Sequence, residues 1–168
     1  VPGLTTSRVT SHIPLSEVSE NISARSVYEA INLLNDVIKG DGIAEPRIAV
    51  AALNPHAGER GQFGREEIDH IAPGVELAKN DGVNVEGPFP SDTVFIAAKN
   101  GEFDGVVTMY HDQGQVAMKL MGFDLGVTVQ GGLPVPIATP AHGTAYGIVG
   151  QNKAGLGPTQ RAFDIATN

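Results

Sequence analysis

Cysteine is absent from the 168-residue sequence, and aromatic residues make up only 5% of it. Without cysteine the chain has no disulfide, no thiolate nucleophile and no zinc–thiolate site, so a bound transition metal would need His, Asp or Glu ligands. No window approaches the roughly 20 consecutive apolar residues of a membrane helix, and no signal-peptide pattern opens the chain. We therefore expect a soluble globular protein that has no membrane partner.

Positive charge is also scarce, because 11 Lys and Arg residues face 19 Asp and Glu residues and leave a net charge of −8. A non-specific nucleic-acid surface needs a basic patch, so we expect no nucleic-acid partner. Three motifs are missing as well: G-x-G-x-x-G after the first strand, G-x-x-x-x-G-K-[ST], and G-x-S-x-G. Ordinary Rossmann and P-loop nucleotide binding are thereby excluded, and serine hydrolysis is poorly supported.

Short β-branched runs alternate with helical apolar periods along the chain, which is typical of an α/β fold with a mostly parallel sheet. We predict strands at 8–11, 47–53, 83–86, 105–109, 127–129 and 135–138, and helices at 24–39, 65–80 (interrupted near Pro73), 92–100, 113–121 and 159–167. No repeat or linker-like composition divides the sequence, so we predict one α/β unit over residues 1–168. The chain begins Val1-Pro2-Gly3 without a methionine, and we expect a fragment or processed product of a longer protein.

Four of the five histidines follow predicted strands: His12, His56, His111 and His142. Ligands bind at the carboxyl edge of open α/β sheets, where such loops converge. Imidazoles from three loops would suit zinc or a related divalent metal. Asp112 and Asp92 could bind the metal or orient its ligands, although Asp92 suits a helix N-cap equally well. The alternative for any single histidine is a solvated surface residue, which is our interpretation of His70.

Two glycine-containing segments are further candidates for ligand loops. Residues 142–158 combine small residues with closely spaced glycines, which lets a backbone approach a flat ligand or a phosphate. Residues 54–67, "NPHAGERGQFGREE", place three glycines before an acidic helix start. A plain surface loop or a mobile connection is the alternative for each.

Several blocks together resemble the 4-hydroxythreonine-4-phosphate dehydrogenase family of vitamin B6 biosynthesis: "HIPL", "LNPHAGE…FGREEID", "GPFPSDTVF", "MYHDQGQVAMKLMGFD" and "HGTAYGIVG". The resemblance covers essentially the whole chain and corresponds to the second half of a family member. It implies a lobe like those of isocitrate and isopropylmalate dehydrogenases. It also implies a cytoplasmic homodimer whose metal site is completed across the subunit interface.

The resemblance also implies roles for individual residues. The ligands of a divalent metal (Zn, Co, Mn or Mg) would be His12, His56 and His111. Lys119 matches the substrate-binding lysine of the family, and we assign catalytic roles to Lys119, Asp112 and Asp92. The loop of His142, Gly143, Thr144 and Ala145 would receive the adenine end of NAD, with NADP left open.

The implied reaction is oxidation of 4-phosphohydroxy-L-threonine by NAD, followed by loss of carbon dioxide from the resulting 3-oxo acid. Thr128 and Ile137 stand where biosynthetic members carry a substrate-binding asparagine and arginine, and the arginine would be the best phosphate partner. A relative acting on a cis-dihydrodiol of terephthalate or on a sugar-acid phosphate is therefore an alternative. A non-catalytic metal- or nucleotide-binding module is the second alternative, and we expect the isolated chain to be inactive.

Overall fold

The structure is a computed structural model that describes residues 3–122 and 126–167. The described residues form two compact units, Gly3–Ala117 and the part of the chain from Met118 onward. From the sequence we expected one α/β unit, because no linker-like composition interrupts it. The boundary between the two units falls within a helix, where the composition does not change.

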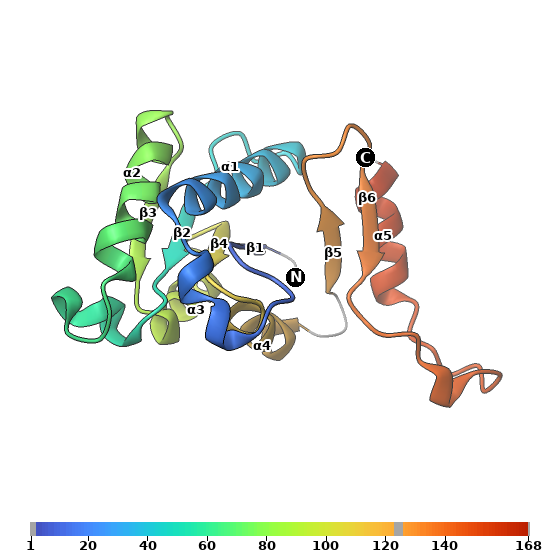
Figure 1. Cartoon of the computed structure of the whole chain (residues 1–168). Helices are drawn as coiled ribbons and strands as arrows, with labels where there is room; N and C mark the ends of the chain where they lie inside the picture. Colours follow the sequence, from blue (N-terminus) through green and yellow to red (C-terminus); the bar gives the residue numbers. More distant parts are fainter. Residues whose placement is uncertain (1–2, 123–125, 168) are drawn as a thin grey trace. The chain divides into compact units, whose positions relative to one another are not determined.

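A sheet of four parallel strands forms the centre of the larger unit, in the order β1-β4-β2-β3 (Figure 1). The strands are β1 (Thr5–Arg8), β2 (Ile48–Ala51), β3 (Val85–Phe89) and β4 (Gly105–Thr108). The central strands β2 and β4 are buried along their whole length. Their continuous apolar runs predicted this, since strands of a parallel sheet are covered on both faces.

The position of β1 differs from the prediction, which placed the first strand at 8–11. The strand lies at Thr5–Arg8, where Ser7 pairs with Val107 of β4. All four residues of β1 are half-buried, and within this sheet the strand pairs only with β4. A polar edge strand has no apolar run to mark it, which explains the error.

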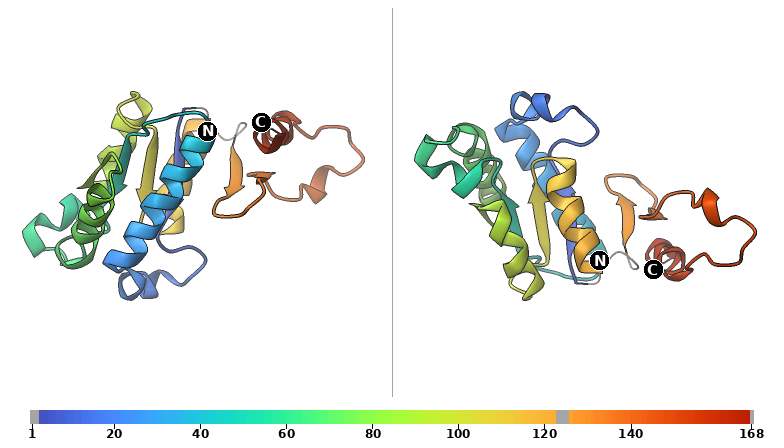
Figure 2. Two further views of the ribbon diagram at one scale, coloured as in Figure 1. Left: turned by 90° about the horizontal axis from the view of Figure 1, so that it is seen from above. Right: turned by 90° about the horizontal axis from the view of Figure 1, so that it is seen from below.

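Helices cover both faces of this sheet (Figure 2). On one face, seen from above, lie α1 (Ala24–Gly40) and α2 (Ala72–Asn80), which pack against each other. On the other face, seen from below, lie α3 (Ser91–Lys99) and the first turns of α4 (His111–Gly122). The helices confirm a parallel sheet flanked by helical layers.

The first helix, α1, shows how local sequence sets an element. Ser23 and Ser26 form a capping box, in which Ser26 N–H donates to Ser23 Oγ (3.1 Å) and Ser23 N–H donates to Ser26 Oγ (3.0 Å). This satisfies two of the backbone donors that every helix start leaves free. The predicted apolar face is buried, comprising Val27, Ile31, Leu34 and Ile38.

Two further helix starts bear on the predictions. The predicted interruption near Pro73 is confirmed, because a π-helical turn, η4 (Glu67–Ile71), precedes α2 and Pro73 lies in the first turn of α2. The interpretation of Asp92 as a helix N-cap is wrong. Pro90 occupies the N-cap position in an extended conformation, and no side chain caps the helix.

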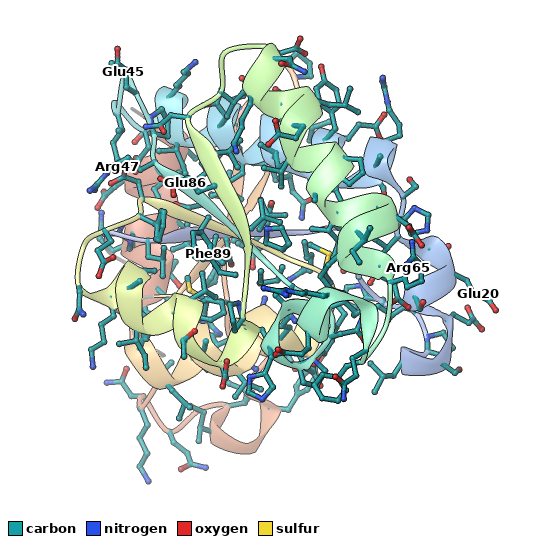
Figure 3. All side chains as sticks on the ribbon, turned by 90° about the vertical axis from the view of Figure 1, so that its left-hand side faces the viewer. Glu20, Glu45, Arg47, Arg65, Glu86 and Phe89 are labelled. Atoms are coloured by element: carbon teal, nitrogen blue, oxygen red, sulfur yellow. The ribbon has the colours of Figure 1, made fainter. Side chains whose placement is uncertain are left out.

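Arg47 and Asp104 join the two central strands where they begin. The Asp104 carboxylate accepts hydrogen bonds from Arg47 Nη2 (2.8 Å), Arg47 Nε (3.0 Å) and the Arg47 backbone N–H (2.8 Å). These bonds hold the pKa of Asp104 below its ordinary value. Figure 3 labels Arg47, together with Glu86 and Phe89 of β3.

The smaller unit contains an antiparallel hairpin of β5 (Val127–Gln130) and β6 (Ile137–Pro140), against which α5 (Gly157–Thr167) packs. A short helical turn, η6 (Tyr146–Ile148), lies between β6 and α5. Among the described residues, no helix combines the length and apolar character that crossing a membrane would require.

Candidate functional site

Pairing of β1 with β4 continues past the end of each strand and brings two histidines together. The backbone N–H of Val9 donates to Thr108 O (2.9 Å), and that of Thr10 donates to Met109 O (3.0 Å). The buried Thr10 hydroxyl adds a bond to the same Met109 oxygen (2.8 Å). The chain segments that follow, with His12 and His111, therefore leave the sheet side by side.

His12 and His111 line one hollow of about 320 Å³ at the carboxyl edge of the sheet. Their ring centroids are 5.3 Å apart, with an angle of 43° between the ring planes. Asp112 and Tyr110 also line the hollow, and Ile13 adds an apolar wall. Two imidazoles, a carboxylate and a phenol thus meet in one concave surface, which is the best-equipped candidate site in the described part of the chain.

Asp112 holds the His111 ring in place. Nδ1 of His111 lies 2.6 Å from Oδ1 of Asp112, and the Asp112 side chain is otherwise exposed. A carboxylate on one ring nitrogen favours the tautomer with its proton on that nitrogen. Nε2 of His111 is then left as the nitrogen that can accept a proton or bind a cation, which is the usual function of such a carboxylate beside a ligand histidine.

Gln113 connects the starts of the loops that leave β4 and β2. Its Oε1 accepts the Met109 backbone N–H (2.7 Å), and its Nε2 donates to Ala52 O (2.8 Å). Met109 and Ala52 are fully buried, so neither backbone group could form a hydrogen bond with water in place of Gln113. Gln113 therefore fixes the first turn of α4, the turn that carries His111.

His56 follows β2 in a turn, η3 (Pro55–Gly61), of unusual conformation. The φ angles of residues 56–60 are 52°, 53°, 76°, 42° and 56°, so five consecutive residues are left-handed. Each non-glycine residue in this region costs roughly 1–2 kcal/mol, so the surrounding structure must hold the turn. His56 is exposed, and its ring centroid lies 6.3 Å from that of Phe63.

Asn54 and Glu66 are part of what holds this loop. Asn54 Nδ2 donates to Glu66 Oε2 (2.7 Å), and the Ser19 hydroxyl donates to Glu66 Oε1. The Ser19 bond is the main reason that the pKa of Glu66 is lowered. The loop that we interpreted as either ligand-binding or mobile is thus tied down at its base.

The donor types in the hollow suit a divalent metal, and the arrangement supplies part of a ligand set. Among residues 3–122 and 126–167, no group of three His, Asp or Glu side chains is placed to hold a metal ion. His12 and His111 come together, whereas His56 does not line their hollow. The chain therefore provides two imidazoles at one point, and a complete ligand set needs further donors.

The remaining predicted residues lie apart from this pair. Asp92 is exposed in the first turn of α3 and makes no hydrogen bond or ion pair with described residues. Lys119, in α4, is also exposed and has no ion-pair partner in the described part of the chain. Thr128 is half-buried in β5, opposite Thr139 of β6.

The predicted NAD loop follows β6 in the smaller unit, and its four residues are exposed: His142, Gly143, Thr144 and Ala145. His142 Nδ1 lies 2.9 Å from the backbone oxygen of Gly143, and Ala145 is left-handed, with φ of 53°. A Cβ built on Gly143 would meet nothing within 4 Å. This backbone is therefore open to the approach of a flat ligand.

Sequence reasoning missed the residues that position the histidines, namely Thr10, Asn54, Glu67 and Gln113. Thr10, Glu67 and Gln113 bond to backbone groups of distant segments, and the Asn54 amide donates to the Glu66 and Glu67 carboxylates. No local spacing reveals these contacts. Glu67 offered one usable signal, since a carboxylate that falls on the buried side of a helical turn must have partners.

Comparison with known proteins gives a consistent family. The sequence matches the model for the pyridoxal phosphate biosynthetic protein PdxA over residues 1–166. A Pseudomonas aeruginosa protein, provisionally named 4-hydroxythreonine-4-phosphate dehydrogenase 2, is 58% identical over 165 residues, which are 97% of this chain and 49% of that protein. The chain spans about half the length of the curated relatives it matches.

Two solved structures extend the comparison. The 4-hydroxythreonine-4-phosphate dehydrogenase of Klebsiella pneumoniae is 37% identical with a TM-score of 0.88, over 99% of this chain and 50% of that one. The terephthalate 1,2-cis-dihydrodiol dehydrogenase of Burkholderia xenovorans LB400 is 31% identical with a TM-score of 0.79, over 98% of this chain and 52% of that one. Both likenesses extend over nearly the whole chain.

Proposed function

Since the chain belongs to the family of the pyridoxal phosphate biosynthetic protein PdxA, we propose that it supplies half of an NAD-dependent, divalent-metal-dependent dehydrogenase. The parent enzyme would be a cytoplasmic homodimer with two lobes like those of isocitrate and isopropylmalate dehydrogenases, and this chain would be its carboxyl-terminal half. Its reaction is oxidation of a secondary alcohol, followed by loss of carbon dioxide from the resulting 3-oxo acid. The observation that carries the proposal is the hollow shared by His12 and His111 at the carboxyl edge of a parallel sheet.

We assign the metal to His12, His111 and His56, with the ligand set completed across the interface with a partner subunit. When bound, the cation would supply Lewis-acid stabilisation of negative charge that develops on the substrate oxygen. Asp112 orients His111 and keeps Nε2 free of its proton. Asp92, exposed at the start of α3, would carry a second carboxylate near the same edge of the sheet.

Lys119 would contribute a fixed positive charge for substrate anions, since its exposed ammonium is not neutralised by any described carboxylate. The loop 142–145 would receive the adenine end of NAD. The nicotinamide ring at the other end of NAD would accept the hydride. Support for this comes from the exposed backbone at Gly143, which leaves room for a flat ring.

The preferred substrate class is 4-phosphohydroxy-L-threonine, and one observation favours a second candidate. Thr128 and Ile137 lie on paired strands of the hairpin, and neither carries a charge for a phosphate. A cis-dihydrodiol carboxylate of the terephthalate type carries no phosphate, and the likeness to the Burkholderia xenovorans enzyme covers 98% of this chain.

The test is NADH formation, by absorbance at a divalent-metal concentration that saturates the enzyme, on the two substrates in parallel. We would assay the chain alone and a chimera in which it replaces the matching segment of the Klebsiella pneumoniae relative. We expect no turnover by the chain alone and metal-dependent turnover by the chimera. A chimera that folds, binds NAD and acts on neither substrate would contradict the proposal.

Three variants of the chimera assign the site. His12→Ala and His111→Ala should each abolish turnover and weaken cobalt(II) binding at least 10-fold, because each removes a ligand. His70→Ala is the matched control, since this histidine lies in η4 and does not line the hollow. Equal losses in all three variants would mean that the hollow has no special function.

A further inference from the structure

The turn that carries His56 begins on a buried carboxylate. Glu67 is only 3% exposed. Its Oε1 accepts the backbone N–H groups of Leu53 (2.9 Å) and Asn54 (2.7 Å), and its Oε2 accepts Asn54 Nδ2 (3.0 Å). Three donors from the two residues that precede the turn therefore converge on one side chain.

The same carboxylate also contacts the middle of the turn. Gly58 is buried and left-handed, with φ of 76°, and a Cβ built on it would lie 2.6 Å from Glu67 Oε2. The backbone of the turn at Gly58 is thus packed directly against the Glu67 carboxylate, and no space is left for a side chain there. Glu67 consequently fixes the residues before the turn, Leu53 and Asn54, and the position of Gly58 against η4.

A carboxylate suits this arrangement, in which both oxygens accept hydrogen bonds. It offers acceptors on both oxygens, whereas a glutamine of the same shape offers one oxygen and one NH2 group. With the glutamine oxygen on the Leu53 and Asn54 N–H groups, its NH2 would face the NH2 of Asn54, and two donors would oppose each other. The change Glu67→Gln therefore breaks the contact without creating a cavity.

We propose that Glu67 is a positioning residue for His56: its buried carboxylate holds the left-handed turn that carries the imidazole. The inference rests on the proposed function, in which His56 is a ligand. It assigns to Glu67 no contact with substrate, cofactor or metal.

The experiment separates conformation from binding. The conformation is followed by NMR of the histidine Cε1–Hε1 resonances in the metal-free chain, assigned with His12→Ala, His56→Ala and His111→Ala. Glu67→Gln should shift the His56 resonance and leave those of His12 and His111 in place. Glu76→Gln, an exposed carboxylate of α2 with the same change in charge, is the control.

Binding is followed in the chimera by titration with cobalt(II), through the visible absorption of the bound ion. Glu67→Gln should weaken the affinity by about 10-fold or more, the scale expected for a group that orients a ligand. Addition of cobalt(II) in excess should then restore the wild-type spectrum, since the His56 ligand itself is still present. A spectrum that differs at saturation would overturn a purely positioning role.

Asn54→Ala protects the test against loss of the fold. It removes the side-chain bonds to Glu67 Oε2 and Glu66 Oε2 and leaves both backbone bonds to Glu67 Oε1. If Glu67→Gln unfolds the chain, the test uses the His56 resonance of Asn54→Ala instead. A resonance unchanged from wild type then refutes the inference.

The two proposals fail in different ways. If His56→Ala leaves cobalt(II) affinity unchanged, His56 is no ligand and the proposed site is wrong, while the NMR shift still reports whether Glu67 sets the turn. If His56→Ala weakens binding but Glu67→Gln changes neither the resonance nor the affinity, the site stands and the positioning role is refuted.

Discussion

Asp104 accepts three hydrogen bonds from Arg47, two from the guanidinium and one from the backbone N–H, where the central strands β2 and β4 begin. The Asp104 side chain is 16% exposed, whereas that of Arg47 is 48% exposed. The Asp104 carboxylate is therefore largely buried and accepts its hydrogen bonds from a guanidinium group that is partly exposed to solvent. This contact has a consequence for how stability depends on pH.

The folded-state pKa of Asp104 is depressed, first because the Arg47 side chain donates to it. The contribution of Asp104 to stability is therefore complete above its unfolded pKa of about 3.9 and is lost as pH falls through the lower folded value. Urea unfolding at pH 7, 5, 4 and 3 should show less stability for Arg47→Met at pH 7 and a gap to wild type that narrows toward pH 3. Arg25→Met, from an exposed helix pair with Glu29, should change little at any pH. A gap that is constant with pH would contradict the assignment to Asp104.

Gly58→Ala tests how tightly the His56 turn lies on Glu67. Gly58 and Gly82 have similar positive φ angles, 76° and 85°, but a Cβ on Gly82 would meet nothing within 4 Å. Both alanine variants should lose roughly 1–2 kcal/mol for the left-handed backbone. Gly58→Ala should lose about 1–3 kcal/mol more, because its Cβ overlaps the carboxylate. Chemical denaturation measures both, and equal losses would show that the turn has room to move.

Gln113→Leu tests the bridge between the ends of β4 and β2. Leucine fills a similar volume but leaves the Met109 N–H and the Ala52 oxygen buried without partners. Each of the two unsatisfied groups costs about 1–3 kcal/mol, so we expect a loss of about 2–6 kcal/mol in the free energy of unfolding. The control is Gln62→Leu, at an exposed position whose side chain makes no hydrogen bond with described residues. A loss no larger than that of the control would mean that water replaces the amide.

The sequence predicted those parts of the fold that hydrophobic burial determines. Strands β2 and β4 and the apolar face of α1 were marked by continuous or periodic apolar residues, and all are buried. The edge strand β1 was misplaced because its residues are polar and half-buried. Burial leaves a pattern in the sequence, whereas edge pairing does not.

The residue types of the candidate site could be predicted from the sequence, but their arrangement in space could not. Position after a strand marked His12 and His111, but their contact depends on β1 lying next to β4, and strand order is not encoded in spacing. His56 was marked by the same rule. Its left-handed turn, however, is held by Glu67, which lies beyond the end of that turn in the sequence. Long-range hydrogen bonds set both outcomes.

Asp112→Asn tests whether the hollow is organised for cation binding. In wild type the Asp112 carboxylate lies 2.6 Å from Nδ1 of His111 and holds a proton there, so Nε2 remains a free donor of electrons. An amide of the same shape carries no charge and can turn either its oxygen or its NH2 toward the ring. It therefore no longer selects the tautomer that leaves Nε2 without a proton.

In the chimera we expect Asp112→Asn to weaken cobalt(II) binding by about 10- to 100-fold, with no change in the midpoint of urea unfolding, because the Asp112 side chain is 78% exposed. Asp36→Asn provides the control, as an exposed aspartate of α1 that makes no hydrogen bond with described residues. If both variants bind cobalt(II) as wild type does, the short contact between Asp112 and His111 is a surface pair without function. If Asp112→Asn binds weakly and His111→Ala no more weakly than that, the carboxylate accounts for the whole contribution of His111 to binding.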